Sequence, residues 1–326
     1  MKTQIVYTLI SSEKDYFLEE LWVSLYSFRQ FHPEATVNVL VDEPTKKYME
    51  RFPELCGMIT NIVVVPVPEN YNAKQRSRVI KTTVRNVIDG AYLFVDTDTV
   101  ICKPLDDIDS LTCDIAAVPD GHLHLSECMF PPTNSVNKIF KTDVSDSKYW
   151  FNSGVMFVAD NELTRKFYKR WNENWTYSCF KKGQSQDQPA LLATDKEFGY
   201  LISELPGIYN AQVAMSLKYF ADAAIVHWWH MSFIENQDYS PYFSLQIYKD
   251  VKKFKGLSDE TIEQIEHCKQ SFVSPSMPVG KEHIYFLFSP AGKVFNRIYK
   301  EGGAACFLMN KCASILEKIH KYTKKK

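Results

Sequence analysis

Short, continuous β-branched runs alternate with helical patterns over the first two thirds of this chain, and this alternation constrains the fold more than any other feature. Three early runs are mainly apolar and rich in β-branched residues: residues 4–9, 37–41 and 62–65. Such runs are typical of strands covered on both faces. A helical stripe follows the first run and is formed by Phe17, Leu21, Leu25 and Phe28. The order predicts an α/β domain with a mainly parallel, mixed sheet flanked by helices.

The same alternation continues further along the chain. We expect a helix at about 75–88 and strands at 92–95, 115–118 and 155–158. Between the last two strands lies an unpatterned stretch, residues 121–148. Ordered domains seldom keep so long a loop without using it, so this stretch is either a substrate-facing segment or a surface insertion.

Charge and cysteine content exclude several classes of protein. The chain has 326 residues with 38 Lys and Arg against 39 Asp and Glu, so it lacks the uniform basic field of a nonspecific nucleic-acid binder. The sequence contains no run of 18 apolar residues, the length that a helix needs to span a bilayer. The eight cysteines lack the spacing of a zinc site, which favours free thiols in a reducing compartment. We therefore expect a cytoplasmic protein with no nucleic-acid partner.

The string LFVDTDTVI places Asp96 and Asp98 directly after an apolar strand. In an open α/β sheet, ligands collect beyond the carboxyl ends of the strands. Two carboxylates one residue apart can share a hard divalent ion, which often completes its shell with phosphate oxygens. The pair therefore predicts a site where Mg²⁺ or Mn²⁺ holds a nucleoside diphosphate. The alternatives are a solvated strand end and a phosphatase of the haloacid-dehalogenase type, in which Asp96 is the nucleophile and Asp98 the acid/base.

Several strings occur together in an order that resembles the nucleotide-sugar glycosyltransferases of the GT-A fold, most nearly those of family 8. They are VYTLI (6–10), RSRVIKT (76–82), VDTDTVI (95–101), FNSGVMFV (151–158), DQPALL (187–192), LPGIYN (205–210) and IVHWWH (225–230). The likeness covers roughly residues 3–230. It implies that Asp96, Asp98 and His227 hold a divalent metal, Mn²⁺ or Mg²⁺. It also implies transfer of a hexose from a UDP-sugar with retention of configuration.

The resemblance extends to residues that would surround the donor. Arg78 and Lys81, on one helix face, would reach the diphosphate or nucleotide; a solvated helix face is the alternative. Thr8 and Asp42, at two strand ends, would meet the nucleoside, and Thr97 belongs to the same nucleotide-binding set. The remaining residues lie in two strings: Asn152, Ser153 and Gly154 ahead of a strand, and Asp187 and Gln188 at the start of a helix.

The resemblance implies that residues of these two strings contact the donor sugar. Ser153 and Gly154 offer a hydroxyl group and close backbone approach to the donor, unless they form a plain turn. Asn152, Asp187 and Gln188 would act at the reaction centre. Asp187 has two alternative roles, as a simple helix N-cap and, in an inverting enzyme, as the general base.

The sequence departs from the family after His227. The glycine, lysine, proline and tryptophan that usually follow are replaced by WWHMSF (228–233), so His230 is a rival metal ligand and the diphosphate-binding lysine is in doubt. A core histidine is the alternative for His227. A second group, His122, His124 and Cys128, could suggest a softer metal site, although no further ligand pattern accompanies it.

We expect a GT-A-like catalytic domain over residues 1–240, with a nucleotide-binding half to about 118 and an acceptor half from about 119, and a helical region at 241–326. The acceptor would be a hydroxyl group of a glycan or glycolipid. Residues 298–326 carry seven Lys and two Glu among apolar residues, a pattern that favours a basic helix on an anionic membrane surface or one docked on the catalytic domain. A relative that binds nucleotide-sugar without turnover is the remaining alternative.

Overall fold

The computed structural model describes residues 1–128, 132–213, 215–228, 245–272, 286 and 288–323. The chain divides into two compact units, Met1–Ser276 and Met277–Lys326. The boundary predicted at residue 240 lies outside the described residues. Helices that follow it, α8 (Leu245–Phe254) and α9 (Asp259–Glu266), belong to the first unit.

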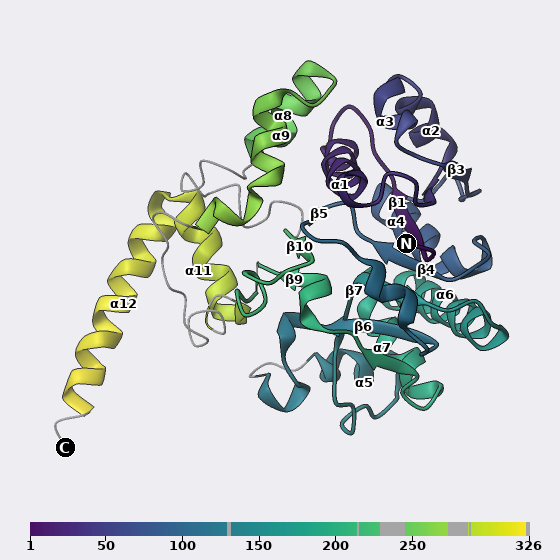
Figure 1. Ribbon diagram of the computed structural model, residues 1–326. Coiled ribbons are helices and arrows are strands. Elements are labelled where there is room, and N and C mark those ends of the chain that lie inside the picture. The colour runs from purple at the N-terminus through teal and green to yellow at the C-terminus, as the bar shows by residue number, and fades with distance from the viewer. Residues whose placement is uncertain (129–131, 214, 229–244, 273–285, 287, 324–326) are drawn as a thin grey trace. The chain divides into compact units, whose positions relative to one another are not determined.

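The first unit is built mainly from alternating strands and helices (Figure 1). Up to the middle of the chain these are β1 (Gln4–Leu9), α1 (Phe17–Phe31), β2 (Val37–Val41), α2 (Glu43–Met49), α3 (Pro53–Gly57), β3 (Asn61–Val64), α4 (Ala73–Thr83), β4 (Tyr92–Val95), β5 (Thr99–Ile101) and β6 (Ile115–Pro119). There follow α5 (Thr133–Phe140), β7 (Phe151–Val158), α6 (Glu162–Lys182), α7 (Gln188–Glu197), β8 (Ile202–Glu204), β9 (Ala211–Gln212) and β10 (Ile225–His227). Short 3₁₀ turns occupy Val84–Asn86, Asp106–Ser110, Asp120–His122, Leu125–Glu127, Gly207–Asn210 and Cys268–Phe272.

A seven-stranded sheet in the order β3-β2-β1-β4-β7-β6-β8 forms the centre of this unit. The pairs β3·β2, β2·β1, β1·β4 and β6·β8 are parallel, and β7 runs antiparallel to both β4 and β6. The predicted mixed sheet with mainly parallel pairing is confirmed. A second sheet of three strands, in the order β5-β10-β9, lies beyond the end of β4.

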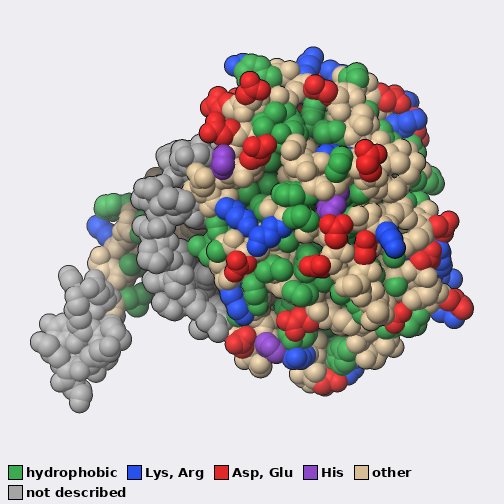
Figure 2. Space-filling view, in the orientation of Figure 1, with side chains coloured by type: hydrophobic (Ala, Val, Ile, Leu, Met, Phe, Trp, Pro, Cys, Tyr) green, Lys and Arg blue, Asp and Glu red, His purple; other side chains and the backbone are tan. Residues whose placement is uncertain are grey.

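Each face of the large sheet is covered by its own apolar core. Alternate side chains of a strand point to opposite faces. Accordingly Ile5 and Tyr7 of β1 pack in one core with α1, whereas Val6 packs in the other with α4, α6 and α7. This double covering explains why β1 and β2 are mainly apolar instead of alternating between apolar and polar residues. Figure 2 shows basic and acidic side chains interspersed over the visible face of the unit, as the nearly neutral charge predicts.

The predicted strands 4–9, 37–41 and 92–95 match β1, β2 and β4 in both bounds. Two expectations need correction. Asn152, Ser153 and Gly154 lie inside β7 rather than ahead of a strand, so a plain turn is excluded. The stretch 121–148 also has structure of its own, since α5 lies within it and Val136 and Val144 pack against Leu192 of α7.

The second unit contains α11 (Pro290–Glu301) and α12 (Gly303–Thr323). Ser289 caps α11, because its hydroxyl oxygen accepts a hydrogen bond from the Gly292 amide at 2.9 Å. Gly302, between the two helices, and Gly303, the first residue of α12, have positive φ angles that suit glycine. Within the described residues, no helix has both the length and the apolar character that a membrane crossing needs.

Candidate metal and donor site

Asp96 and Asp98 lie in the turn that connects the large sheet to the small one, between β4 and β5. The Asp96 amide donates to the Gly154 carbonyl at 2.7 Å, which ties the turn to β7. The Thr99 hydroxyl donates to the Asp96 carbonyl at 2.9 Å and closes the turn from within. The two carboxylates are therefore held by a backbone that is fixed at both ends.

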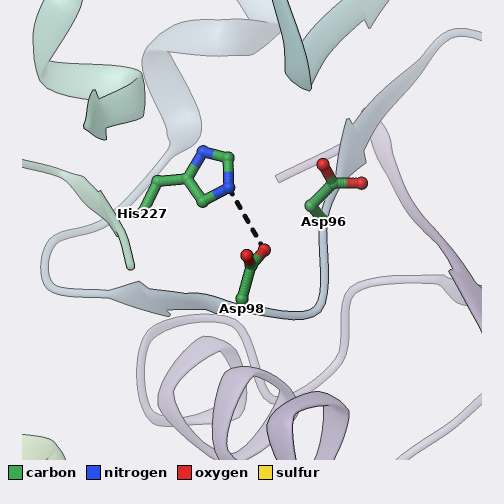
Figure 3. A group of neighbouring side chains, drawn as sticks. All are labelled: Asp96, Asp98 and His227. Carbon is green, nitrogen blue, oxygen red and sulfur yellow. Dashed lines mark ion pairs between the residues drawn. The ribbon is translucent and has the colours of Figure 1, made fainter. Parts of the chain in front are cut away.

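His227 reaches the same place from the end of β10. Strand β10 pairs antiparallel with β5, with His227 opposite Thr99, and the Trp228 amide donates to the Asp98 carbonyl at 2.9 Å. As Figure 3 shows, the imidazole ring faces the Asp98 carboxylate, with His227 Nε2 3.1 Å from Asp98 Oδ1. One ligand atom from each of Asp96, Asp98 and His227 lies within 4.8 Å of the others. The structure thus brings the three predicted metal ligands together.

A chain of amide side chains determines which nitrogen of His227 faces the carboxylates. Asn152 Nδ2 donates to Asp120 Oδ1 at 2.8 Å, so its oxygen accepts from Asn210 Nδ2 at 2.9 Å. The Asn210 oxygen then faces His227 Nδ1 at 2.9 Å and can only accept. His227 therefore carries its proton on Nδ1, and Nε2 is the nitrogen available to a metal. Carbonyl or carboxylate partners of this kind commonly orient metal-binding histidines.

Gly154 provides the space in which these groups meet. A Cβ atom at this position would lie 2.4 Å from His227 Cε1, 2.8 Å from Asn152 Oδ1 and 3.0 Å from Asp96 Oδ2. The pairing of β7 with β6 passes from Met156 opposite Ala117 to Asn152 opposite Val118. Such irregularities often redirect side chains beside active sites. Here the irregularity falls on the β7 segment that contains Gly154.

Lys81 of α4 is the main cation beside the acidic turn. Its side chain is only 3% exposed, and Nζ donates to both carboxylate oxygens of Asp96, at 3.0 and 3.1 Å. The ammonium group also lies 4.7 Å from the centre of the Phe94 ring. A buried ammonium needs such partners, because burial alone would disfavour its charge.

Asp187 joins the same cluster from the start of α7. Arg78 Nε pairs with Asp187 Oδ1 at 3.0 Å, Ser153 Oγ donates to Oδ2 at 2.7 Å, and Lys81 Nζ lies 3.9 Å from Oδ2. Asp187 occupies the N-cap position of α7, but its side chain makes no capping hydrogen bond. The simple N-cap alternative is therefore wrong. Gln188 Nε2 donates to Asp120 Oδ1 at 3.3 Å, which links it to the amide chain.

Burial and neighbouring charges shift the acid–base properties of these groups. Burial raises the pKa of Asp96, and the Asp98 charge adds to this effect while Lys81 opposes it. Burial works against a charged His227, but the attraction of Asp98 outweighs it and raises the pKa. Burial also opposes ionisation of Asp187, yet Arg78 and Lys81 together lower its pKa to about 2. Asp187 is thus a permanently ionised, weakly basic carboxylate.

The remaining predicted donor residues lie in other surroundings. Thr8 is in β1, where it pairs with Leu40 in the sheet register. Asp42 is buried, caps α2 through the Thr45 amide at 2.9 Å, and forms an ion pair with Arg76. The hydroxyl group of Thr97 donates to Glu20 of α1 at 3.3 Å. The proposed contacts of these residues with a nucleotide stay predictions.

The second predicted metal group does not assemble. His122, His124 and Cys128 lie among the described residues, but their side chains do not come close enough together to share a metal ion. Among the described residues, the three side chains that do so are Asp96, Asp98 and His227. His122 Nε2 accepts from the Gln212 amide at 3.2 Å, so that histidine supports the fold. The rival ligand His230 lies outside the described residues.

Two residues of the site escaped the sequence analysis. Asn210 ends the string LPGIYN, but nothing in its spacing indicated a bond to His227 across 17 residues. Asp120 follows β6 directly, and burial raises the pKa of its carboxyl group while Asn152 and Gln188 oppose the shift. Its place just after a strand was the one available signal, since ligands gather at strand ends in such sheets.

Two solved structures of glycosyltransferases resemble the described fold. The described fold is similar to the galactosyltransferase LgtC in complex with donor and acceptor sugar analogues (TM-score 0.50, 14% identity, 80% of this chain and 100% of that one). It is also similar to the glycosyltransferase GlyE of Streptococcus pneumoniae TIGR4 (TM-score 0.50, 16% identity, 85% of this chain and 67% of that one).

These likenesses show the GT-A fold alone, because the identities are low. No curated protein sequence matches the chain. The model of the family described as Glycosyl transferase family 8 matches residues 8–232, which is more than half of the sequence. The chain therefore belongs to glycosyl transferase family 8.

Proposed function

We propose that this glycosyltransferase moves a hexose from a UDP-sugar to a hydroxyl group of a glycan or glycolipid, with retention and with Mn²⁺ or Mg²⁺. The observation that carries the proposal is the convergence of Asp96, Asp98 and His227 within 4.8 Å. Two carboxylate oxygens and an imidazole nitrogen suit either ion. The ion would polarise the departing diphosphate and neutralise the charge that develops on it.

The charge of the cluster supports a diphosphate as the donor group. Asp96 and Asp187 contact the cations of Lys81 and Arg78, and Asp98 beside Asp96 brings the carboxylates to three against two cations. The cluster is therefore negative by one charge when His227 is neutral, and a divalent cation would reverse its sign. Lys81 and Arg78 would then adjoin a positive site that attracts a diphosphate.

The state of Asp187 supports retention rather than inversion. An inverting enzyme needs a general base whose pKa lies near the working pH. Arg78 and Lys81 hold the pKa of Asp187 at about 2, so this carboxylate is a poor proton acceptor. Its ion pair and its hydrogen bond from Ser153 favour a role in positioning the donor sugar.

Donor turnover by the purified chain tests the proposal. We expect hydrolysis or transfer from a UDP-hexose that requires Mn²⁺, stops with a chelator and returns when metal is restored. Phosphate release from a phosphomonoester would instead support the phosphatase. Stabilisation by UDP-sugar without turnover would support a binding protein.

Substitution of the ligands tests the site itself. Asp98→Asn and His227→Ala should each lower metal-dependent turnover by orders of magnitude, because each removes a proposed metal ligand. His230→Ala should have little effect. The control Asp222→Asn alters an exposed carboxylate and should turn over normally. If His230→Ala abolishes turnover and His227→Ala does not, the assignment of the third ligand is wrong.

A further inference from the structure

Two thiols from distant parts of the chain meet behind the small sheet. Cys102 Sγ and Cys268 Sγ are 3.5 Å apart, although 166 positions separate the residues in sequence. Cys102 directly follows β5, and its amide donates to the Ala224 carbonyl at 2.7 Å. Cys268 begins the 3₁₀ turn after α9 and is 1% exposed. A backbone that is fixed on both sides therefore holds the sulfur atoms in contact.

A cavity of about 440 Å³ is lined by Cys102 of this pair. Its walls come from α1, the end of β5 and the segment after α9, and they include Tyr26, Cys102 and Lys269. Cys102 is only partly buried, whereas Cys268 is buried and does not line the cavity. A small molecule that enters the cavity therefore meets the Cys102 sulfur first.

The surroundings favour the thiolate of Cys102. The hydrogen bond from Cys268 is the largest influence and lowers the pKa of Cys102 in spite of burial, with further help from Lys269 and Lys103. Both ammonium groups are held nearby, Lys269 by the Ala223 carbonyl at 2.7 Å and Lys103 by the Asp222 carbonyl at 2.9 Å. A thiolate next to cations is the usual form of a reactive cysteine.

We propose that Cys102 and Cys268 form a redox-active thiol pair that reacts with a low-molecular-weight disulfide. The Cys102 thiolate attacks one sulfur of the small disulfide, which breaks the S–S bond and releases one small thiol after protonation. Cys268 then attacks Cys102 Sγ, its proton passes to the second departing thiolate, and an internal disulfide forms. Two protein thiols are oxidised and one small disulfide is reduced to two thiols.

Formation of the bond requires only a local movement. The sulfur atoms must approach from 3.5 Å to about 2.05 Å, the length of a disulfide bond. The product would link the segment after α9 to β5, and β5 pairs with the strand that carries His227. Because it closes a long loop, the bond should raise the unfolding temperature.

Oxidised glutathione is the probe, applied to the full-length chain without reductant. Free thiols are then blocked, and the digested protein is analysed by mass spectrometry. We expect a peptide that joins Cys102 to Cys268, its loss on reduction, and an unfolding temperature that is higher in the oxidised protein. Cys56, whose thiol donates to the Met49 carbonyl at 3.3 Å, should remain unlinked and serves as an internal control.

Two variants test the order of the steps. Cys268→Ser should stop the reaction at a glutathione adduct on Cys102, whereas Cys102→Ser should leave Cys268 unmodified. The proposal is overturned if both thiols of the wild-type protein stay free while the exposed Cys312 reacts. The mass-spectrometric result for the wild-type protein tests the proposal even if a variant does not fold. The outcome is independent of the proposed sugar transfer, because it is read without donor or metal.

Discussion

At the scale of single residues, the space at Gly154 is the sharpest requirement of the site. We expect Gly154→Ala to displace the His227 ring, since the new Cβ would lie 2.4 Å from Cε1. Overpacking of this kind costs about 1–3 kcal/mol, and the metal ligands would bear the displacement. Metal affinity, measured by titration calorimetry, should fall by at least about tenfold.

Gly57→Ala is the matched control. It makes the same chemical change at the end of α3, where no atom lies within 4 Å of the added Cβ. It should leave metal affinity unchanged. Equal affinities for the Gly154 and Gly57 variants would contradict the close packing described for the site.

Asn210 provides the second test at this scale, because it would act on the proposed metal only through His227. Asn210→Ala removes the acceptor of His227 Nδ1 and frees the ring to rotate or change tautomer. We expect metal affinity to fall about 10–100-fold, as is typical when a partner of a metal-binding histidine is lost. Asn174→Ala controls for loss of a buried amide, since Asn174 bonds Thr194 within the α6–α7 contact. Equal metal affinities in the two variants would exclude the positioning role.

At the scale of elements, α7 carries a buried carboxyl group that should make stability depend on pH. Asp195 is 2% exposed, and burial raises its pKa to about 6 even though it accepts the Ile202 amide at 2.9 Å. Between pH 3.8 and about 6, the folded state binds more protons at this group than the unfolded state does. Its contribution to the free energy of unfolding therefore falls as pH rises, by roughly 2–3 kcal/mol.

Asp195→Asn should remove that part of the pH dependence. Urea unfolding at pH 4 and pH 7 gives the change in stability for wild type and variant, and the difference between the two changes isolates this group. Asp222→Asn, at an exposed position, should keep the wild-type dependence. A variant at position 195 with the full wild-type slope would show that the carboxyl group is not the source.

Most strands could be predicted from the sequence because two cores enclose the large sheet. Residues 4–9, 37–41 and 92–95 are mainly apolar for that reason, and their bounds were predicted correctly. The start of β7 was missed because Asn152 and Ser153 are polar and turn-like, although they are buried in the sheet. Helix α5 was missed because only Val136 and Ile139 are buried in it, too few for a clear helical period.

The two aspartates of the site could be predicted from the sequence, but the residues that position the site through tertiary contacts could not. Asp96 and Asp98 stand out because carboxylates directly after an apolar strand need a partner. Asn210 and Asp120 act through tertiary contacts, which leave no spacing in the sequence. Family resemblance supplied His227, and the structure then brought it to the aspartates.

At the scale of the whole molecule, the second unit has a surface that the catalytic site does not explain. Phe307, Leu308, Ile315 and Leu316 of α12 are each at least 57% exposed, and Lys311 lies 4.7 Å from the Phe307 ring. Apolar and basic groups together match the interior and the charge of an anionic lipid surface. We propose that α12 docks the enzyme on such a membrane.

Deletion of residues 300–326 should abolish sedimentation with anionic vesicles and spare donor hydrolysis. Replacement of Phe307 and Leu308 by Ser should weaken sedimentation strongly, whereas Asn310→Ser on the same helix should not. Neutral vesicles should bind the wild-type chain less well, because the lysines lose their attraction. Unchanged sedimentation after the deletion would exclude this membrane contact.

The antiparallel register of β5 and β10, with His227 opposite Thr99, brings Asp98 and His227 together across 128 intervening residues. The ion site therefore cannot exist in a nascent chain that has emerged only as far as β9, even with both aspartates in place. The proposed uptake of Mn²⁺ during synthesis would begin only after β10 has emerged, while α8 and α9 are still to be added to the same unit. The proposed metal binding would then report a late step in the folding of this unit.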